Sequence, residues 1–191
     1  MGRIVSNFFI SLDGVVEAPE QWHFPYFNEE MGHAIGHGVA ECDAFLMGRR
    51  LYEEWVEYWP KHGEVASAPG EPGTADEFAD FINQVPKYVV SNTLSEATWN
   101  NTTIVSGDVA ARLREITSQT ARDIGMSGSA TLVRWLLANG LVDELNLLVH
   151  PIVVGHGQRL FEDTPTHPLR LVRHEGFKTG VLHLAYAPEV N

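Results

Sequence analysis

The chain has 191 residues, a length typical of one domain, and 44% of them are hydrophobic, which is enough to form a sizeable core. The 25 acidic residues outnumber the 13 basic ones and give a formal net charge of −12. This balance argues against nucleic-acid binding, because a phosphate backbone is bound by clustered Lys and Arg. No run approaches the roughly 18 apolar residues of a membrane span, and no secretory signal pattern is visible. We therefore expect one domain over residues 1–191, in the cytoplasm, that contacts neither nucleic acid nor membrane.

Hydrophobic periodicity and turn residues divide the first 58 residues into five segments: a strand over Ile4–Ser11, an ordered loop over Val16–Tyr26, a helix ending near Ala40, a buried strand over Ala44–Met47 and a helix over Arg49–Tyr58. The turn Leu12-Asp13-Gly14 ends the first strand. Asn28 is a favourable cap for the first helix, and Gly48 is the hinge between the second strand and its helix.

The single cysteine, Cys42, follows the first helix and excludes an intramolecular disulfide, which fits a reducing cytosol. Its neighbours Glu41 and Asp43 are negatively charged and should raise the pKa of the thiol. We therefore expect Cys42 to be a small packed side chain and not a nucleophile.

After a loop without periodicity over Pro60–Thr74, the rest of the chain continues the alternation: a helix over Ala75–Gln84, strands over Lys87–Ser91 and Thr102–Val105, a helix capped by Asp108, a strand over Asp123–Met126, a helix over Ala130–Asn139, a strand over Glu144–His150 and a closing hairpin over Leu169–Glu175 and Val181–Tyr186. Strands that alternate with helices predict an α/β fold with a mainly parallel sheet, to which the hairpin adds antiparallel strands.

The segment AFLMGRRLY, residues 44–52, has the features of an anion site. Gly48 lets a phosphate approach the backbone, the following helix offers unpaired N–H groups, and the guanidinium of Arg49 or Arg50 can fork onto the phosphate. The alternative is an ordinary surface helix that begins with two solvated arginines.

A second strand, turn and helix junction lies in DIGMSGSATLVRWLL, residues 123–137. Its turn of small residues, 127–129, can pass beneath a pyrophosphate, although many α/β units have such turns without a ligand. Both junctions are expected at the carboxyl ends of strands, where ligands gather in open α/β sheets. Together they favour a dinucleotide, to which the hydroxyl and amide groups of Ser91-Asn92-Thr93 would add contacts.

These motifs, in the order strand-SLDG, LMGRRLYE, KYVVSNTL and SGSATLVRWLLANGLVDELNLLVHPIVVGHGQRLF, resemble the dihydrofolate reductase-like proteins. More narrowly, the chain is similar to the group that shares the reductase domain of the bifunctional riboflavin-biosynthesis deaminase–reductase. The resemblance covers nearly the whole chain, and residues 140–161 are its most specific part. It implies a three-layer dihydrofolate reductase-like fold with a mixed, mainly parallel sheet, the cofactor NADPH, and hydride transfer.

The resemblance also implies roles for individual residues on the cofactor side. Gly48, Arg49 and Arg50 would take the region of the adenosine 2′-phosphate. Ser91 and Asn92 would lie along the same adenosine half. The residues that would cradle the pyrophosphate are Gly128, Ser129, Ala130 and Thr131. The chain departs from the family pattern at Ser127, where a glycine is usual.

On the substrate side, Trp22 and Phe24 would form the walls of the acceptor pocket. Phe27 stands where dihydrofolate reductases have the carboxylate that holds the pterin ring, so folate is not the expected substrate, although one of the three residues that follow could substitute. MGRRLYEEW replaces the ribosyl-phosphate segment of the riboflavin enzymes, and no second phosphate cluster is evident. Asp13 either positions a ring or bonds to its own turn. The proton could come from Asp13, Glu29 or water.

The sequence thus predicts an NADPH-dependent reductase for a small heteroaromatic acceptor, pterin- or pyrimidinedione-like, or for an imine or carbonyl compound. The alternative is a non-catalytic nucleotide- or ligand-binding protein on the same fold. No metal is expected: His33 and His37 have zinc-binding spacing, but neither an intervening glutamate nor a third ligand accompanies them. We also expect a homodimer that forms around the closing strands.

Overall fold

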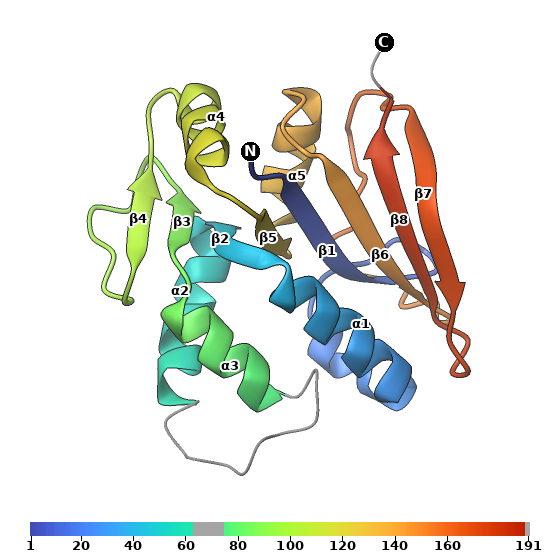
Figure 1. Cartoon of the computed structure of the whole chain (residues 1–191). Helices are drawn as coiled ribbons and strands as arrows, with labels where there is room; N and C mark the ends of the chain where they lie inside the picture. Colours follow the sequence, from blue (N-terminus) through green and yellow to red (C-terminus); the bar gives the residue numbers. More distant parts are fainter. Residues whose placement is uncertain (63–74, 190–191) are drawn as a thin grey trace.

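The computed structural model describes residues 1–62 and 75–189. Its centre is an eight-stranded sheet with the order β4-β3-β2-β5-β1-β6-β8-β7 (Figure 1). The strands are β1 (Ile4–Ser11), β2 (Cys42–Gly48), β3 (Lys87–Val90), β4 (Thr102–Val105), β5 (Asp123–Ser127), β6 (Glu144–His150), β7 (Leu169–Gly176) and β8 (Leu182–Pro188). The six neighbouring strands from β4 to β6 in this order are parallel to one another. β8 is antiparallel to both β6 and β7.

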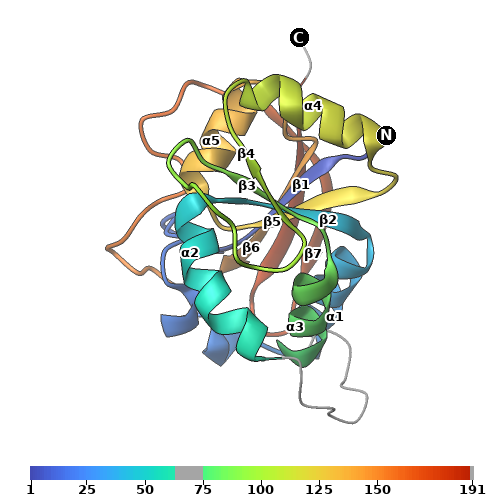
Figure 2. The ribbon, with the colours of Figure 1, turned by 90° about the vertical axis from the view of Figure 1, so that its left-hand side faces the viewer.

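Helices cover both faces of this sheet and give three layers. The helices are α1 (Glu29–Ala40), α2 (Arg49–Tyr58), α3 (Ala75–Gln84), α4 (Val109–Gln119) and α5 (Ala130–Ala138). In the edge-on view of Figure 2, α1, α2 and α3 lie on one side of the sheet, and α4 and α5 lie on the other. None of the helices within the two described ranges is both long and apolar enough to cross a membrane.

Side-chain alternation along the strands explains the layers, because successive residues of a strand point to opposite faces. Ile4 and Phe8 of β1 join the large core beneath α4 and α5, whereas Phe9 packs beneath α1. In β2, Leu46 faces the first core and Met47 faces a separate cluster beneath α2 and α3. The α1–α3 face therefore has two apolar clusters, one under α1 and one under α2 and α3.

The predicted alternation and the mainly parallel sheet are confirmed. Small differences occur at element ends: β2 begins at Cys42, and the last strand runs over Leu182–Pro188. Within the predicted loop Pro60–Thr74, the chain first forms a short 3-10 turn, Trp59–Lys61, while residues 63–74 lie outside the described residues. Cys42 is partly buried, and burial first, then Asp123, raises the pKa of its thiol to about 12, which agrees with the expected packed cysteine.

Candidate functional site

The two predicted junctions meet at the carboxyl edge of the sheet. Their strands, β2 and β5, are neighbours, so the turns that follow these strands lie side by side. A direct hydrogen bond joins them: the N–H of Gly48 donates to Ser129 Oγ at 2.9 Å. A Cβ at Gly48 would lie only 3.2 Å from that oxygen, so glycine permits the close approach. The two junctions therefore lie next to each other, and their binding of one shared ligand stays a prediction.

The turn between β5 and α5 has a left-handed backbone at two successive residues. Gly128 has φ 75°, which glycine adopts at little cost, and Ser129 has φ 58°, which is uncommon for a residue with a side chain. Because the Ser129 hydroxyl accepts from Gly48 and not from its own helix, α5 begins without a side-chain cap. Its first N–H groups thus remain available to a ligand.

Helix capping separates the two junction helices from the others whose starts are described. α1 is capped by Asn28, which accepts from the N–H of Met31, and α4 is capped by Asp108, which accepts from the N–H of Ala111. α2 and α5 have no such side-chain bond. Uncapped N–H groups at a helix start, together with the positive end of the helix dipole, form a natural anion site. Here two such starts lie next to each other.

Basic side chains accompany these helix starts. Arg49 and Arg50 are exposed at the first turn of α2, and Arg49 pairs with Glu53 at 3.0 Å. Sequence reasoning missed Arg134 on α5. Its guanidinium lies 3.5 Å from Thr131 Oγ1 and donates to the carbonyl of Glu162 at 2.9 Å. The available signal was its spacing, because a residue three positions after Thr131 lies on the same helix face.

The segment after β3 reaches the same edge but uses its polar side chains locally. Val90, which ends β3, pairs in register with Gly48, so Ser91 follows at the level of the junctions. The Ser91 hydroxyl accepts from the N–H of Thr93 and of Leu94, and the Asn92 side chain accepts from the N–H of Gly107. In the described part of the chain, no hydrogen bond connects this turn with either junction, so its cofactor contacts stay a prediction.

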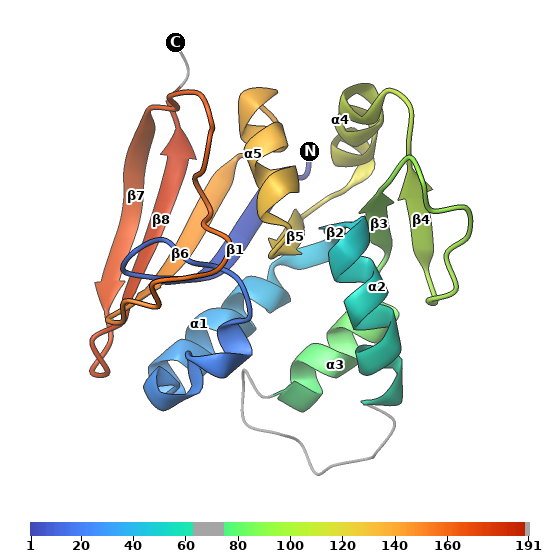
Figure 3. The ribbon, with the colours of Figure 1, turned by 180° about the vertical axis from the view of Figure 1, so that it is seen from behind.

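Asp13 bonds within its own turn, as one of its two predicted roles requires, and it also reaches the segment after β6. Its other predicted role, to position a ring, stays a prediction. Its two oxygens accept from the N–H of Val154 and of Gly155 at 3.0 and 2.9 Å, and also from the hydroxyl of Ser11. These hydrogen bonds, that of Ser11 first, lower the pKa of Asp13 to about 2. Asp13 therefore ties the segment after β1 to the segment after β6, which lie together in Figure 3, and holds no proton at neutral pH.

The three aromatic residues predicted on the substrate side comprise one buried and two exposed side chains. Trp22 is 8% exposed, donates its indole N–H to the carbonyl of Glu17 and packs edge-on to His150, so its role as a pocket wall stays a prediction. Phe24 and Phe27 are 63% and 42% exposed and flank the ring of His23. These two remain available to a ligand.

A groove beside α1 collects further polar side chains. This α1 groove, with a volume of about 670 Å³, lies between α1 and the strands β1, β6, β8 and β7. Its lining includes Glu29, the first residue of α1, whose side chain is 88% exposed and lies 3.6 Å from His33 Nε2. The lining consists of Asn7, Glu29, Glu30, His33, Ala34, His37, Gly38, Asn146, Arg173, Glu175 and His183.

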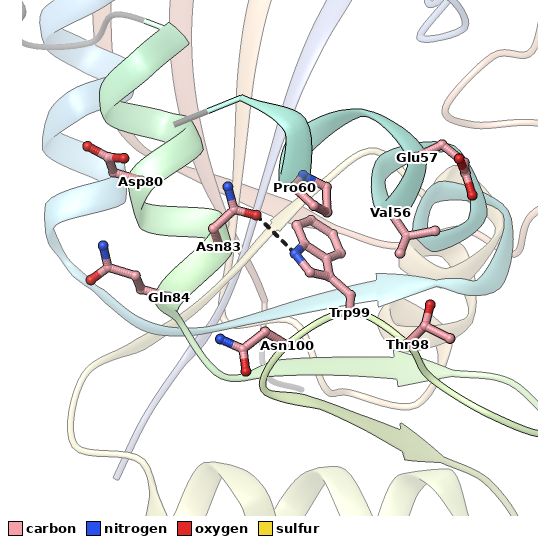
Figure 4. Close-up of a pocket in the computed structure, with 9 residues that line it drawn as sticks. All are labelled: Val56, Glu57, Pro60, Asp80, Asn83, Gln84, Thr98, Trp99 and Asn100. Atoms are coloured by element: carbon pink, nitrogen blue, oxygen red, sulfur yellow. Dashed lines mark hydrogen bonds between the residues drawn. The ribbon is translucent and has the colours of Figure 1, made fainter. Parts of the chain in front are cut away.

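A second cavity, of about 530 Å³, lies at the ends of α2 and α3 and contains none of the predicted site residues (Figure 4). Trp99 points into it and donates its indole N–H to Asn83 at 3.0 Å. Asn83 also donates to the carbonyls of Trp59 and His62, so its amide joins three segments. None of the residues that line this cavity belongs to the joined helix starts.

Comparison with known proteins agrees with this architecture. The family model described as the RibD C-terminal domain matches residues 3–183. The chain belongs to this family. Membership supports a reductase of the type found in riboflavin biosynthesis, and the predicted fold is confirmed as that of RibD reductase domains.

Individual relatives of the RibD C-terminal domain family are distant. The uncharacterized protein YyaP of Bacillus subtilis (strain 168) is 27% identical over 186 residues, which cover 96% of this chain and 94% of that protein. A putative riboflavin biosynthesis protein from Shewanella sp. PV-4 has a TM-score of 0.73 at 16% identity, with 98% and 99% of the two chains covered. The deaminase/5-amino-6-(5-phosphoribosylamino)uracil reductase of Thermotoga maritima has a TM-score of 0.62 at 13% identity. The match covers 98% of this chain and 56% of that one. At such identities the solved structures support the fold alone.

Proposed function

We propose that this chain is an NADPH-dependent reductase that transfers a hydride to a small heteroaromatic, imine or carbonyl acceptor. The observation that carries the proposal is the pair of uncapped helix starts, α2 and α5, joined by the bond between Gly48 and Ser129. The start of α5 suits the pyrophosphate of a dinucleotide, and the start of α2 suits the 2′-phosphate. Arg49 and Arg50 supply positive charge at the start of α2.

The residues at the two helix starts support NADPH as the cofactor. Gly128 and Ser129 form the left-handed turn that leads into α5, and Ala130 and Thr131 begin the helix whose N–H groups would bind the phosphates. When bound, the cofactor would supply the hydride, and the protein would align the acceptor and exclude water. Because Asp13 holds no proton at neutral pH, Glu29 or water is left to protonate the product.

Replacing Arg49 tests the assignment of the 2′-phosphate, which NADPH has and NADH lacks. We expect Arg49→Ala to weaken NADPH binding by roughly 10- to 100-fold, the value of one or two charge-assisted hydrogen bonds, and to change NADH binding by less than about twofold. Fluorescence titration of each nucleotide measures both. Arg112→Ala on α4, which also removes an exposed Arg–Glu pair, is the matched control. Equal losses for the two nucleotides would contradict the role.

A non-catalytic nucleotide-binding protein is the second candidate. The hydrogen bonds of Asp13 favour this candidate, because backbone N–H groups occupy the carboxylate of one of the two side chains predicted as proton donors. The two candidates differ in turnover. A screen that follows NADPH absorbance with pterins, pyrimidinediones and quinonoid acceptors decides between them: consumption with any acceptor supports the reductase, whereas tight binding without consumption supports the second candidate.

A further inference from the structure

The floor of the α1 groove is polar where a covered sheet face is normally apolar. Asn7 of β1 and Asn146 of β6 are paired in register and both line the groove. Two residues further along the same face, Phe9 and Leu148 pack in the apolar cluster beneath α1. Polar groups are costly on a covered face unless they are hydrogen-bonded. The change from apolar to polar side chains therefore points to a polar occupant.

Asn146 has hydrogen-bonding capacity left over. An amide side chain offers two donors and two acceptor sites. Its Nδ2 donates to Glu144 at 3.2 Å and its Oδ1 accepts from Arg173 at 3.4 Å, so one donor and one acceptor site remain. His183, on the neighbouring strand β8, adds a ring nitrogen to the groove, and burial lowers its pKa and keeps it neutral. Asn146 and His183 thus offer hydrogen-bond donors and acceptors that carry no charge.

Charge around the groove disfavours an anionic ligand. Glu29 and Glu175 both belong to the lining. The lining contains one Arg and no Lys, and that Arg173 is already paired with Glu144 at 3.3 Å. A phosphate here would meet carboxylates of like charge, and the lining has no second Arg or Lys to offset them. This differs from the Thermotoga maritima relative, whose name specifies a phosphoribosyl substrate.

Asn7 connects the groove with the proposed cofactor site. Along β1 and β5 it pairs in register with Ser127, the residue before Gly128. Its Nδ2 donates to the carbonyl of Met126 at 3.3 Å, and no group in residues 1–62 or 75–189 donates a hydrogen bond to its Oδ1. A molecule on the groove floor therefore lies next to the strand that leads into the proposed pyrophosphate turn.

On the basis of the proposed reductase function, we infer that the α1 groove binds the acceptor, and that this acceptor is an uncharged, unphosphorylated heterocycle. Asn7, Asn146 and His183 would bind its ring, which should present alternating N–H and C=O groups as a pyrimidinedione does. A groove of about 670 Å³ is of the size that small-molecule sites have.

Calorimetry with a matched pair of ligands tests this inference. The pair is 5-amino-6-ribosylaminouracil and its 5′-phosphate, added to the chain without nucleotide at pH 8, where histidines are largely uncharged. We expect the unphosphorylated compound to bind at least about tenfold more tightly. Tighter binding of the phosphate, or no binding of either compound, would overturn the inference. NADPH is titrated separately, so a failure of the proposed reductase function is distinguished from a failure of the groove.

Two variants test whether the compound binds in the groove. Asn146→Ala should weaken binding of the unphosphorylated compound about tenfold, the value of one or two hydrogen bonds. Gln84→Ala in the second cavity should leave this affinity unchanged. Glu175→Lys should strengthen binding of the phosphate several-fold and leave the other compound unchanged, with Glu57→Lys in the second cavity as its control. Circular dichroism verifies that each variant is folded. An unchanged affinity in both groove variants would place the ligand elsewhere and refute the assignment.

Discussion

At the scale of single residues, Asp13 has the most unusual environment near the proposed site. A carboxylate that accepts two backbone N–H groups and a hydroxyl is stabilised in its charged form. Arg159 adds to this arrangement: its Nε donates to the carbonyl of Asp13, and its Nη2 lies 3.6 Å from the carboxylate. The side chain is thus a link between two loops and unsuited to proton donation.

The variant Asp13→Asn tests whether Asp13 links two loops or acts as a proton donor. An amide cannot accept from both Val154 and Gly155 as a carboxylate does, so we expect Tm to fall by a few degrees at pH 7. Because the folded pKa of about 2 is below the ordinary 3.8, the stabilisation is complete above pH 4 and is lost as the pH falls through 2. Melting curves at pH 7 and pH 3 should therefore show a smaller difference at pH 3.

The same variant should keep the rate of NADPH oxidation within about threefold, with whichever acceptor supports turnover. Loss of a general acid costs on the order of 100-fold or more. A loss of that size in Asp13→Asn, with affinity for NADPH unchanged, would make Asp13 a catalytic residue and contradict the interpretation given above.

At the scale of elements, capping separates α1 and α4 from α2 and α5, the two helices that we propose bind the cofactor. Asp108 caps α4, so Asp108→Ala should lower the free energy of unfolding by about 1 kcal/mol and leave NADPH affinity unchanged. Ser129 does not cap α5 but joins it to Gly48. Ser129→Ala should therefore weaken NADPH binding several-fold, because the two helix starts lose their fixed spacing. Urea unfolding and nucleotide titration of both variants measure the contrast; the same affinity loss in each would remove the distinction.

The elements themselves could be predicted from sequence because their signals are local. Caps such as Asn28 and turn residues such as Gly48 act on neighbouring residues, and the structure confirms both. The site was only partly predictable, since its contacts join residues far apart in the chain. Nothing near Trp22 indicates that it packs against His150, and nothing near Asp13 indicates that its partners are residues 154 and 155. Such pairings depend on β1 and β6 being neighbours in the sheet.

At the scale of the whole molecule, strand order explains why one edge of the sheet gathers the proposed site. β5 lies between β1 and β2 although it follows both by many residues. This insertion places the turn after β5 beside the turn after β2, and places the floor of the α1 groove on the other side of the same strand. A parallel arrangement aligns all of these carboxyl ends, which is the general position of ligands in such sheets.

The β7 end of the sheet is where we expect the interface of a homodimer. β7 is an edge strand, nearly all of its residues are exposed, and Leu171, Val172 and Leu182 in the hairpin are 45%, 46% and 47% exposed. An edge strand with exposed apolar side chains tends to pair with another chain. We therefore expect light scattering to give twice the chain mass of 21.2 kDa. Val172→Lys, which places a charge on that edge, should give the monomer mass, whereas Gln119→Lys on α4 adds the same charge elsewhere and should not. A monomer in the unmodified protein would refute the prediction, and a dimer that persists in Val172→Lys would move the interface away from β7.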